Sequence, residues 1–279
     1  MNSDIHPSSP APTGVSADAS PATPGAVRLS GGTDLPLPGV GTWQLRGSGA
    51  YRAVRTALDA GYRHLDTATM YGNEAAVGRA LADSGVPRGQ VFVTTKLPPQ
   101  RAGAASATLD ASRRELKLDS VDLWLIHWPP GGRAAPDVWR EFLAARHTGR
   151  ARAVGVSNYD TAQLDELAAA TGQAPEVNQI RWGPTRYDAE VLAAHRQRGV
   201  VLTGYSPFKS TNLAEPVLAA IAAAHGVDPA RVVLRWHVQH GVVVIPKSAT
   251  ERRIRSNADL GFTLTGEQMA AIDAVGHRS

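Results

Sequence analysis

One pattern repeats along most of this chain of 279 residues: a short run of β-branched and apolar residues, a loop, and then an alanine-rich amphipathic segment. Strands that alternate with helices of this length form parallel βαβ units. Helices are expected at, for example, 51–60, 104–116, 161–170 and 189–198, with glycines placed to end several of them. The pattern predicts eight strands, at residues 40–42, 63–65, 91–95, 121–126, 153–156, 176–178, 200–204 and 242–245.

Eight such units predict an α/β fold, a single-domain (β/α)8 TIM barrel over residues 26–279. The main alternative is an open doubly wound sheet, which normally carries a glycine-rich phosphate loop after an early strand. Neither GxGxxG nor GxxxxGK[ST] occurs, so the sequence favours the barrel. We expect an N-terminal β-hairpin at 27–40 around Gly31-Gly32, and an extra helical stretch at 216–240 before the eighth strand.

Residues 1–25 differ in composition from the rest of the chain. Ser, Pro, Ala and Thr dominate them and leave little to bury, which predicts a disordered N-terminal tail. The tail lacks a basic stretch followed by an apolar one, so we do not interpret it as a secretory signal.

The composition argues against several classes of protein. No run of about twenty apolar residues occurs, so no membrane span is expected. The formal charge is +4 and the basic residues are scattered, which argues against a nucleic-acid-binding stripe. The chain has no cysteine, which excludes disulfides and thiolate chemistry and fits a cytoplasmic location.

Polar or aromatic residues stand at the end of each predicted strand. In a barrel, chemistry collects where the strands end at the carboxyl-terminal face. Any one of these residues, taken alone, is better explained as an ordinary cap or core residue. The whole set is harder to explain in that way: Trp43, Asp66, Lys96, His127, Ser157-Asn158, Gln179, Tyr205 and Lys247.

Asp66, Tyr71 and Lys96 could form one catalytic group. Lys96 is one of just four lysines in an arginine-rich chain, and an isolated strand-end lysine would normally reach to solvent. Beside Asp66 the ammonium would stay charged while buried, and beside Tyr71 it would lower the pKa of the phenol from about 10 toward neutrality. Tyr71 is therefore a candidate general acid.

His127 follows an apolar run and could hydrogen-bond a substrate carbonyl as a neutral imidazole. A metal site with His64 and Asp66 is the alternative. No HxH or HExxH pattern occurs, and a lysine among the ligands would repel a cation. We therefore expect no metal.

The later strand ends suit a nucleotide. Ser157, Asn158 and Gln179 offer groups that match a carboxamide, and Tyr205 could stack on a planar ring. Lys247, Ser248 and Arg253 at a helix start form a candidate phosphate site. The simpler explanation, capping by Thr250 with Glu251 in the first turn, is compatible with phosphate binding.

Seven motifs occur in the order GYRHLDTATMYGNE, VTTKL, LIHWP, GVSN, VNQ, YSP and IPKS. Together they resemble the aldo-keto reductases, in particular the prokaryotic branch that includes diketogluconate reductases. The resemblance covers nearly everything after the tail. It implies NADPH-dependent reduction of small carbonyl substrates on a (β/α)8 barrel, by a monomer.

Carried over motif by motif, the resemblance implies that Tyr71 is the general acid, that Lys96 paired with Asp66 assists it, and that His127 orients the carbonyl. Trp43 and Trp128 match aromatic residues beside the substrate, and the substrate would also contact Tyr71 and His127. The implied NADPH/NADP+ contacts are Gly41, Thr42, Trp43, Asp66, Ser157, Asn158, Gln179, Tyr205, Ser206, Pro207, Phe208, Leu213, Lys247, Ser248, Ala249, Thr250, Arg253 and Asn257.

The chain departs from the family pattern in places. Ser256 stands where a glutamate is usual, and the segment 180–184 (IRWGP) replaces an acidic and histidine-containing form. The link 130–135 is short, and the long C-terminal loop of the animal enzymes does not occur. The two reduced loops predict an open substrate pocket lined mainly by Trp43, Tyr71 and Trp128.

Two other functions fit parts of the pattern. A Schiff-base aldolase could use Lys96 as its nucleophile, with Lys247 and Arg253 holding a substrate phosphate. A regulatory subunit could use the same ring of residues to bind a nucleotide with slow turnover.

Overall fold

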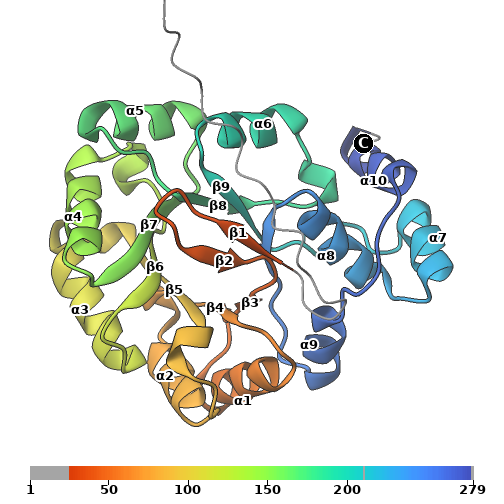
Figure 1. Ribbon diagram of the computed structural model, residues 1–279, viewed down its shortest axis with the longest axis horizontal. Coiled ribbons are helices and arrows are strands. Elements are labelled where there is room, and N and C mark those ends of the chain that lie inside the picture. Colours follow the sequence, from red (N-terminus) through yellow and green to blue (C-terminus); the bar gives the residue numbers. More distant parts are fainter. Residues whose placement is uncertain (1–24, 210, 278–279) are drawn as a thin grey trace, which may run out of the picture.

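The computed structural model describes residues 25–209 and 211–277. Eight parallel strands lie at its centre, each bonded to its neighbour along the chain, and helices surround them (Figure 1). This confirms the predicted (β/α)8 architecture. The strands are β3 (Val40–Gly41), β4 (His64–Asp66), β5 (Phe92–Leu97), β6 (Val121–Ile126), β7 (Ala151–Ser157), β8 (Val177–Arg181), β9 (Val201–Tyr205) and β10 (Val243–Ile245).

The predicted disordered tail lies outside the described residues, apart from Gly25. The division of the chain into a tail and a domain therefore stays a prediction.

The sheet closes between its first and last strands. Just before β3, Pro38 forms a parallel bridge with Val244. The N–H of Val244 donates to Leu37 O, and the N–H of Gly39 donates to Val244 O, both at 2.9 Å. A Cβ atom at Gly39 would lie 2.5 Å from Nδ1 of His64. Closure therefore depends on a glycine at this position, because no side chain fits there.

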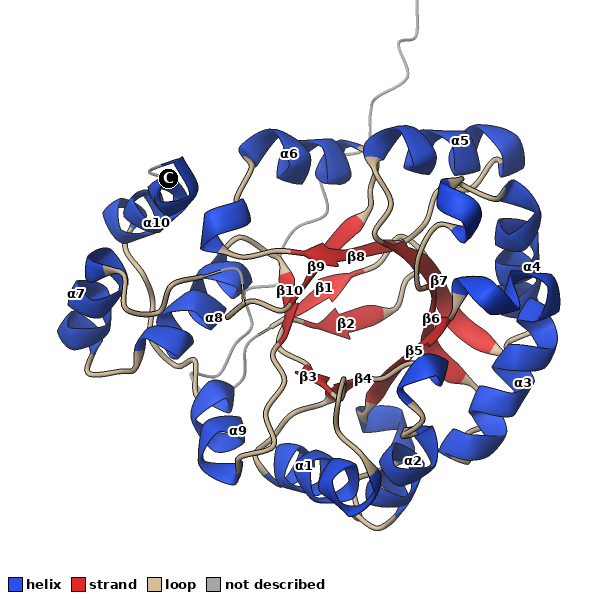
Figure 2. Cartoon of the chain, turned by 180° about the vertical axis from the view of Figure 1, so that it is seen from behind, coloured by secondary structure: helices blue, strands red, loops and turns tan. Residues whose placement is uncertain are grey.

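The helices form the outer layer, which Figure 2 shows from behind. They are α1 (Gly47–Asp59), α2 (Glu74–Ala82), α3 (Ala105–Leu116), α4 (Pro136–His147), α5 (Thr161–Thr171), α6 (Ala189–Gln197), α7 (Pro216–His225), α8 (Pro229–Gln239), α9 (Glu251–Ala258) and α10 (Gly266–Asp273). Helices α7 and α8 confirm the extra helical stretch before the last strand. Among residues 25–209 and 211–277, no single helix is long and apolar enough to cross a membrane; α7 and α8 pass that test only as a pair bent by 89°.

Helix α1 begins at Gly47, four residues earlier than the pattern predicts. Gly47, Ser48 and Gly49 have low helix propensity, so the sequence alone does not indicate helix there. The N–H groups of Gly49 and Ala50 both donate to Arg46 O, which closes the first turn.

The predicted hairpin is confirmed as β1 (Ala26–Arg28) paired antiparallel with β2 (Asp34–Pro36). Its buried leucines belong to the cluster that fills the barrel, together with inward-facing residues such as Phe92 and Leu123. The strands around that cluster run parallel, and the hairpin packs at their amino-terminal end (Figure 1). The leucines are Leu29, Leu35 and Leu37.

Glu176 fixes the hairpin to the barrel. Its carboxylate is buried and accepts hydrogen bonds from the N–H of Gly31 at 2.8 Å and of Val154 at 3.2 Å. Arg146 Nη1 lies 3.1 Å from Oε1 of the same carboxylate. The hairpin therefore covers the amino-terminal end of the barrel interior through buried contacts.

Two buried histidines predict a loss of stability in acid. Burial lowers the pKa of His64 and of His237 to about 4, from 6.5. Because the folded-state pKa lies below the unfolded one, folding favours the neutral ring; this stability is complete above pH 6.5 and is lost as the pH falls toward 4. The shift corresponds to about 3 kcal/mol for each histidine at the acid limit.

Urea unfolding measured across this pH range should show that loss, and His64→Asn should reduce it. His147 is exposed on α4, so His147→Gln is a matched control that should leave the pH dependence unchanged. A free energy of unfolding that stays constant from neutral pH to pH 4 would contradict the prediction.

Candidate active site

The predicted catalytic residues meet at the carboxyl-terminal end of the strands. Asp66 is the last residue of β4, Lys96 lies within β5, and His127 follows β6. The sequence pattern placed Lys96 just after its strand, which is wrong by two residues. The strand is longer because its ladder with β6 continues to Leu97, whose carbonyl accepts the N–H of His127 at 3.0 Å.

Lys96 and Asp66 form a fully buried ion pair. Nζ of Lys96 lies 2.6 Å from Oδ1 of Asp66, and it also donates to the carbonyl oxygen of Thr67 at 2.9 Å. Burial pulls the pKa of Lys96 down, but the negative charge of Asp66 and the contact with Tyr71 outweigh it, so the pKa lies above its usual value. Lys96 is therefore positively charged at neutral pH.

Tyr71 lies against this pair, with its ring centroid 5.2 Å from Nζ of Lys96. Burial raises the pKa of its phenol, and the ammonium of Lys96 lowers it by a smaller amount. The expectation of a pKa that falls toward neutrality is therefore wrong in its net direction, because the ring is almost completely buried. At neutral pH the phenol keeps its proton, which is the form that a general acid requires.

His127 completes the group. Its ring meets that of Tyr71 edge to face, with centroids 5.7 Å apart. Burial, assisted by the charge of Lys96, lowers its pKa to about 3, so the imidazole is neutral. Nδ1 is buried without a hydrogen-bond partner in the described part of the chain. In the Nε2–H tautomer, the ring can donate one hydrogen bond to a carbonyl oxygen.

A buried polar network, which the sequence did not reveal, holds the turn that carries Tyr71. Thr69 Oγ1 donates to the carbonyl of Lys96 at 2.9 Å and lies 3.1 Å from the hydroxyl of Ser112. Ser112 and Thr95 both donate to the carboxylate of Glu74, at 3.2 and 2.6 Å. The only signal was that Thr69 and Glu74 fall within the GYRHLDTATMYGNE motif. The network fixes the turn of Tyr71, the candidate general acid, relative to Lys96.

Asn73 positions the other side of the site. Its Nδ2 donates to the carbonyls of Thr42 and Leu45 at 2.9 and 3.0 Å, and its Oδ1 accepts from Thr67 Oγ1 at 2.7 Å. These bonds tie the loop of Trp43 to the loop of Tyr71. Thr42, a predicted cofactor contact, is buried, and its N–H and hydroxyl both donate to Asp66 O at 3.0 Å. The Thr42 side chain therefore stabilises the fold by holding the end of β3 against β4.

The predicted amide cluster is assembled, but its groups largely bind one another. Gln179 Nε2 donates to Oδ2 of Asp66 at 2.8 Å, and Ser157 Oγ donates to Gln179 O at 2.7 Å. Asn158 Nδ2 donates to His127 O and to Ser157 Oγ, and Tyr205 OH donates to Asn158 Oδ1. Gln179 keeps one N–H and its side-chain oxygen, which still fit a carboxamide.

Three residues that belong to the predicted site, or directly follow one of its residues, adopt left-handed backbone conformations. These are Gln44 (φ 64°), Asn158 (φ 63°) and Ser206 (φ 54°). Such conformations cost free energy in non-glycine residues and concentrate at functional sites. Their position after β3, β7 and β9 supports a binding function for this face.

The predicted phosphate site lies where β10 leads into α9. Thr250 occupies the N-cap position of α9, but its side chain makes no capping hydrogen bond; instead, Ser248 Oγ accepts the N–H of Thr250 at 3.0 Å. Capping by Thr250 is therefore wrong, because Ser248 turns the chain before the helix. The first-turn N–H groups and the exposed Lys247 and Arg253 remain suited to an anion.

The other predicted contacts differ in how far they are exposed. Asn257 and Pro207 are buried, Phe208 and Leu213 pack half-buried against the core, and Ala249 is exposed. Gly41 lies against β10, since a Cβ atom there would be 3.0 Å from Ile245 O.

Trp43 and Trp128 are exposed to 42% and 45% although both are large and apolar. Exposed aromatic side chains beside buried polar groups are typical of a binding pocket. Their exposure agrees with an open pocket at Tyr71.

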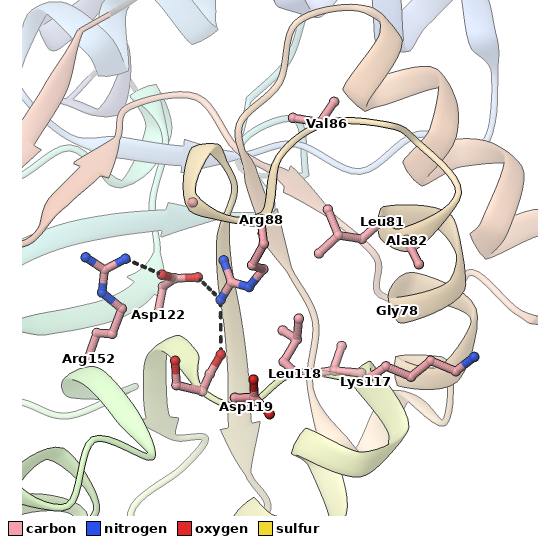
Figure 3. A pocket seen from close by; sticks show the side chains of 13 residues that line it. Gly78, Leu81, Ala82, Val86, Arg88, Lys117, Leu118, Asp119, Asp122 and Arg152 are labelled. Atoms are coloured by element: carbon pink, nitrogen blue, oxygen red, sulfur yellow. Dashed lines mark hydrogen bonds and ion pairs between the residues drawn. The ribbon is translucent and has the colours of Figure 1, made fainter.

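The opposite end of the barrel has a cleft of about 550 Å³, lined by residues of α2 and by residues just before β5 and at the start of β6 and β7 (Figure 3). Arg88 and Arg152 both bind the buried carboxylate of Asp122 there, at 2.6 and 3.2 Å. Asp122 also accepts the N–H of Val93 at 2.8 Å. These residues form a structural ion cluster, and none of the predicted site residues lines the cleft.

The described residues contain no group of three or more His, Asp or Glu side chains that could hold a metal ion.

Comparison with known proteins gives one consistent result. Residues 39–277 match the model of the aldo/keto reductase family. The chain is 42% identical over 255 residues to the 2,5-diketo-D-gluconic acid reductase B of Corynebacterium sp. (strain SHS752001), across 89% of this chain and 92% of that protein.

Solved structures agree. The aldo/keto reductase from Brucella melitensis superposes with a TM-score of 0.86 at 40% identity, covering 90% of this chain and 99% of that chain. The Bombyx mori aldo-keto reductase in complex with NADP superposes with a TM-score of 0.84 at 32% identity, covering 90% and 92%.

Proposed function

Because the chain belongs to the aldo/keto reductase family, we propose that it reduces aldehydes and ketones to alcohols with NADPH, and that Tyr71 donates the proton. The observation that carries this proposal is the contact of a protonated phenol with a buried cation. Nζ of Lys96 is 5.2 Å from the Tyr71 ring centroid and 2.6 Å from Asp66. When bound, the reduced nicotinamide would supply the hydride.

Each of the other side chains of the site has its own role in the proposed reaction. His127 donates a hydrogen bond to the carbonyl oxygen and orients it toward Tyr71. Tyr71 gives its proton to that oxygen as the alcohol forms, and Lys96 stabilises the phenolate that remains. Asp66 keeps Lys96 charged. Trp43 and Trp128 cover the apolar part of the substrate.

The polar, aromatic and basic groups of the site fit NADPH. The free N–H and oxygen of Gln179 suit the carboxamide, and Tyr205 offers a ring whose hydroxyl is already anchored on Asn158. Lys247, Arg253 and the uncapped start of α9 suit a phosphate. The NADP complex of the Bombyx mori protein, a relative with the same fold, supports this choice. We further propose a monomer in the cytoplasm.

The geometry argues against an aldolase. A Schiff-base lysine must lose its proton to attack a carbonyl. Lys96 is held as a cation by Asp66 and by the carbonyl of Thr67, both within hydrogen-bond distance of Nζ.

Stopped-flow oxidation of NADPH and of NADH with a panel of aldehydes and ketones tests the proposal. A reductase should oxidise NADPH in an aldehyde-dependent manner and form the alcohol. Borohydride trapping of a substrate on Lys96 would instead identify an aldolase. Nucleotide binding without turnover of any carbonyl would identify a regulatory subunit.

A further inference from the structure

We propose that Met70 is a site of reversible oxidation, and that its conversion to methionine sulfoxide by hydroperoxides lowers the activity of this protein. The effect on activity rests on the proposed reductase function, whereas the oxidation itself does not. Met70 directly precedes Tyr71, and both belong to the short helical turn Thr69–Tyr71 that follows β4. The oxidised group would therefore lie beside the candidate general acid.

The thioether of Met70 is the sulfur most open to an oxidant in the described part of the chain. The sequence contains no cysteine and three methionines, of which Met1 lies outside the described residues. Met269 is partly buried on α10 and packs against an apolar cluster. Met70, in contrast, is exposed to 52%. Because the chain has no thiol to react first, the accessible thioether of Met70 is the expected target of a hydroperoxide.

The residues on either side of Met70 hold it in this exposed position. Thr69 Oγ1 donates to the carbonyl oxygen of Lys96 at 2.9 Å. Asn73 Nδ2 donates to two backbone carbonyls of the loop after β3, at 2.9 and 3.0 Å. The turn is therefore anchored at both ends. Met70 is accessible without any unfolding, and an oxygen added to its sulfur stays near Tyr71.

Oxidation would change the character of the surface around Tyr71. The exposed large apolar side chains of the described residues are Trp43, Met70 and Trp128, which follow β3, β4 and β6 at the same end of the barrel. A sulfoxide makes the flexible apolar side chain polar. A carbonyl substrate that covers this surface would bury the sulfoxide oxygen without a hydrogen-bond partner, which opposes binding.

The reaction needs a hydroperoxide and no other reactant. A lone pair of the Met70 sulfur attacks the terminal oxygen of the hydroperoxide, so that an S–O bond forms as the O–O bond breaks. The proton of that terminal oxygen moves to the departing oxygen, which leaves as an alcohol, or as water when the oxidant is hydrogen peroxide. Sulfur is oxidised and the peroxide is reduced by the same electron pair. Methionine sulfoxide reductases, specific for each sulfoxide epimer, restore the thioether.

Treatment of the full chain with hydrogen peroxide, followed by removal of the peroxide, tests the proposal. Peptide mapping by mass spectrometry should show that Met70 gains one oxygen faster than Met269. In parallel, kcat/KM for an apolar aldehyde with NADPH should fall by about fivefold or more, because burying an unpaired polar group is costly. Methionine sulfoxide reductases for both epimers, with a thiol reductant, should restore the mass and the activity together.

Substitutions test the assignment to Met70. The readout is the ratio of kcat/KM after treatment to kcat/KM before it, which cancels any effect of a substitution on basal activity. Met70→Leu removes the sulfur and should keep this ratio near one. Met269→Leu is the matched control and should lose activity as the wild type does. Met70→Gln introduces a polar amide at the same position, so its kcat/KM before treatment should be lower than that of Met70→Leu.

Oxidation of Met269 before Met70, or an equal loss of activity in Met70→Leu and the wild type, would overturn the proposal. So would a fully oxidised Met70 with unchanged kcat/KM, or a loss that follows oxidation of Trp43 or Trp128 in the peptide map. The proposed reductase function fails separately, if the untreated protein reduces none of the aldehydes. Peptide mapping would then still measure the oxidation of Met70.

Discussion

Replacing Tyr71 by phenylalanine is expected to lower kcat by about two to four orders of magnitude and to leave NADPH affinity nearly unchanged. The substitution removes the proton donor and keeps the ring that contacts His127. Lys96 keeps its bonds to Asp66 and Thr67, so the cation stays in place. Steady-state kinetics and nucleotide titration together measure both quantities.

A matched control comes from α1. Tyr51 donates to Asp83 on the protein surface, so Tyr51→Phe removes a phenol hydroxyl far from the site and should leave kcat unchanged. If Tyr71→Phe keeps most of its activity, another group donates the proton and the assignment of Tyr71 is wrong. A drop in NADPH affinity equal to the drop in kcat would point to a damaged fold.

The second large effect is expected at the buried ion pair. Lys96→Met leaves the Asp66 carboxylate buried, and among the described residues only the Gln179 side chain then donates to it. Breaking a buried pair from one side destabilises a protein by about 3–5 kcal/mol. The same change removes the cation that we propose stabilises the Tyr71 phenolate, so kcat should fall by about as much as in Tyr71→Phe.

The double variant Lys96→Met/Asp66→Leu separates the two effects. With both charges gone, the free energy of unfolding should recover much of the loss, because no unpaired charge remains buried. Activity should not recover. Urea unfolding and kcat measured over the double-mutant cycle provide this comparison. Additive losses of stability would show that the pair is not coupled, and recovered activity would exclude an electrostatic role for Lys96.

The periodicity of the sequence was sufficient to predict the barrel. Strand and helix patterns are local, and all eight predicted strands overlap an observed strand of the sheet. The family match likewise confirms the resemblance carried by the ordered motifs. Boundaries were less accurate, as at Gly47 and Leu97, because hydrogen bonds to other segments decide where an element begins or ends.

That the candidate catalytic residues lie together could also be predicted from the sequence, because strand ends converge at one face of a barrel. The sequence could not indicate which other side chains form hydrogen bonds with these residues. Gln179 is 113 residues from Asp66, yet it donates to the same carboxylate as Lys96. Glu74 and Ser112, 38 residues apart, hold the turn of Tyr71.

By itself, the sequence of this protein determined the kinds of elements, their order and the residues at the strand ends, since these depend on local periodicity and spacing. Only the tertiary structure decided the protonation of those residues. The pKa of Tyr71 is raised, and not lowered, because burial by several elements outweighs the single charge of Lys96. Burial is a sum over contacts from the whole chain, and no local pattern contains that sum.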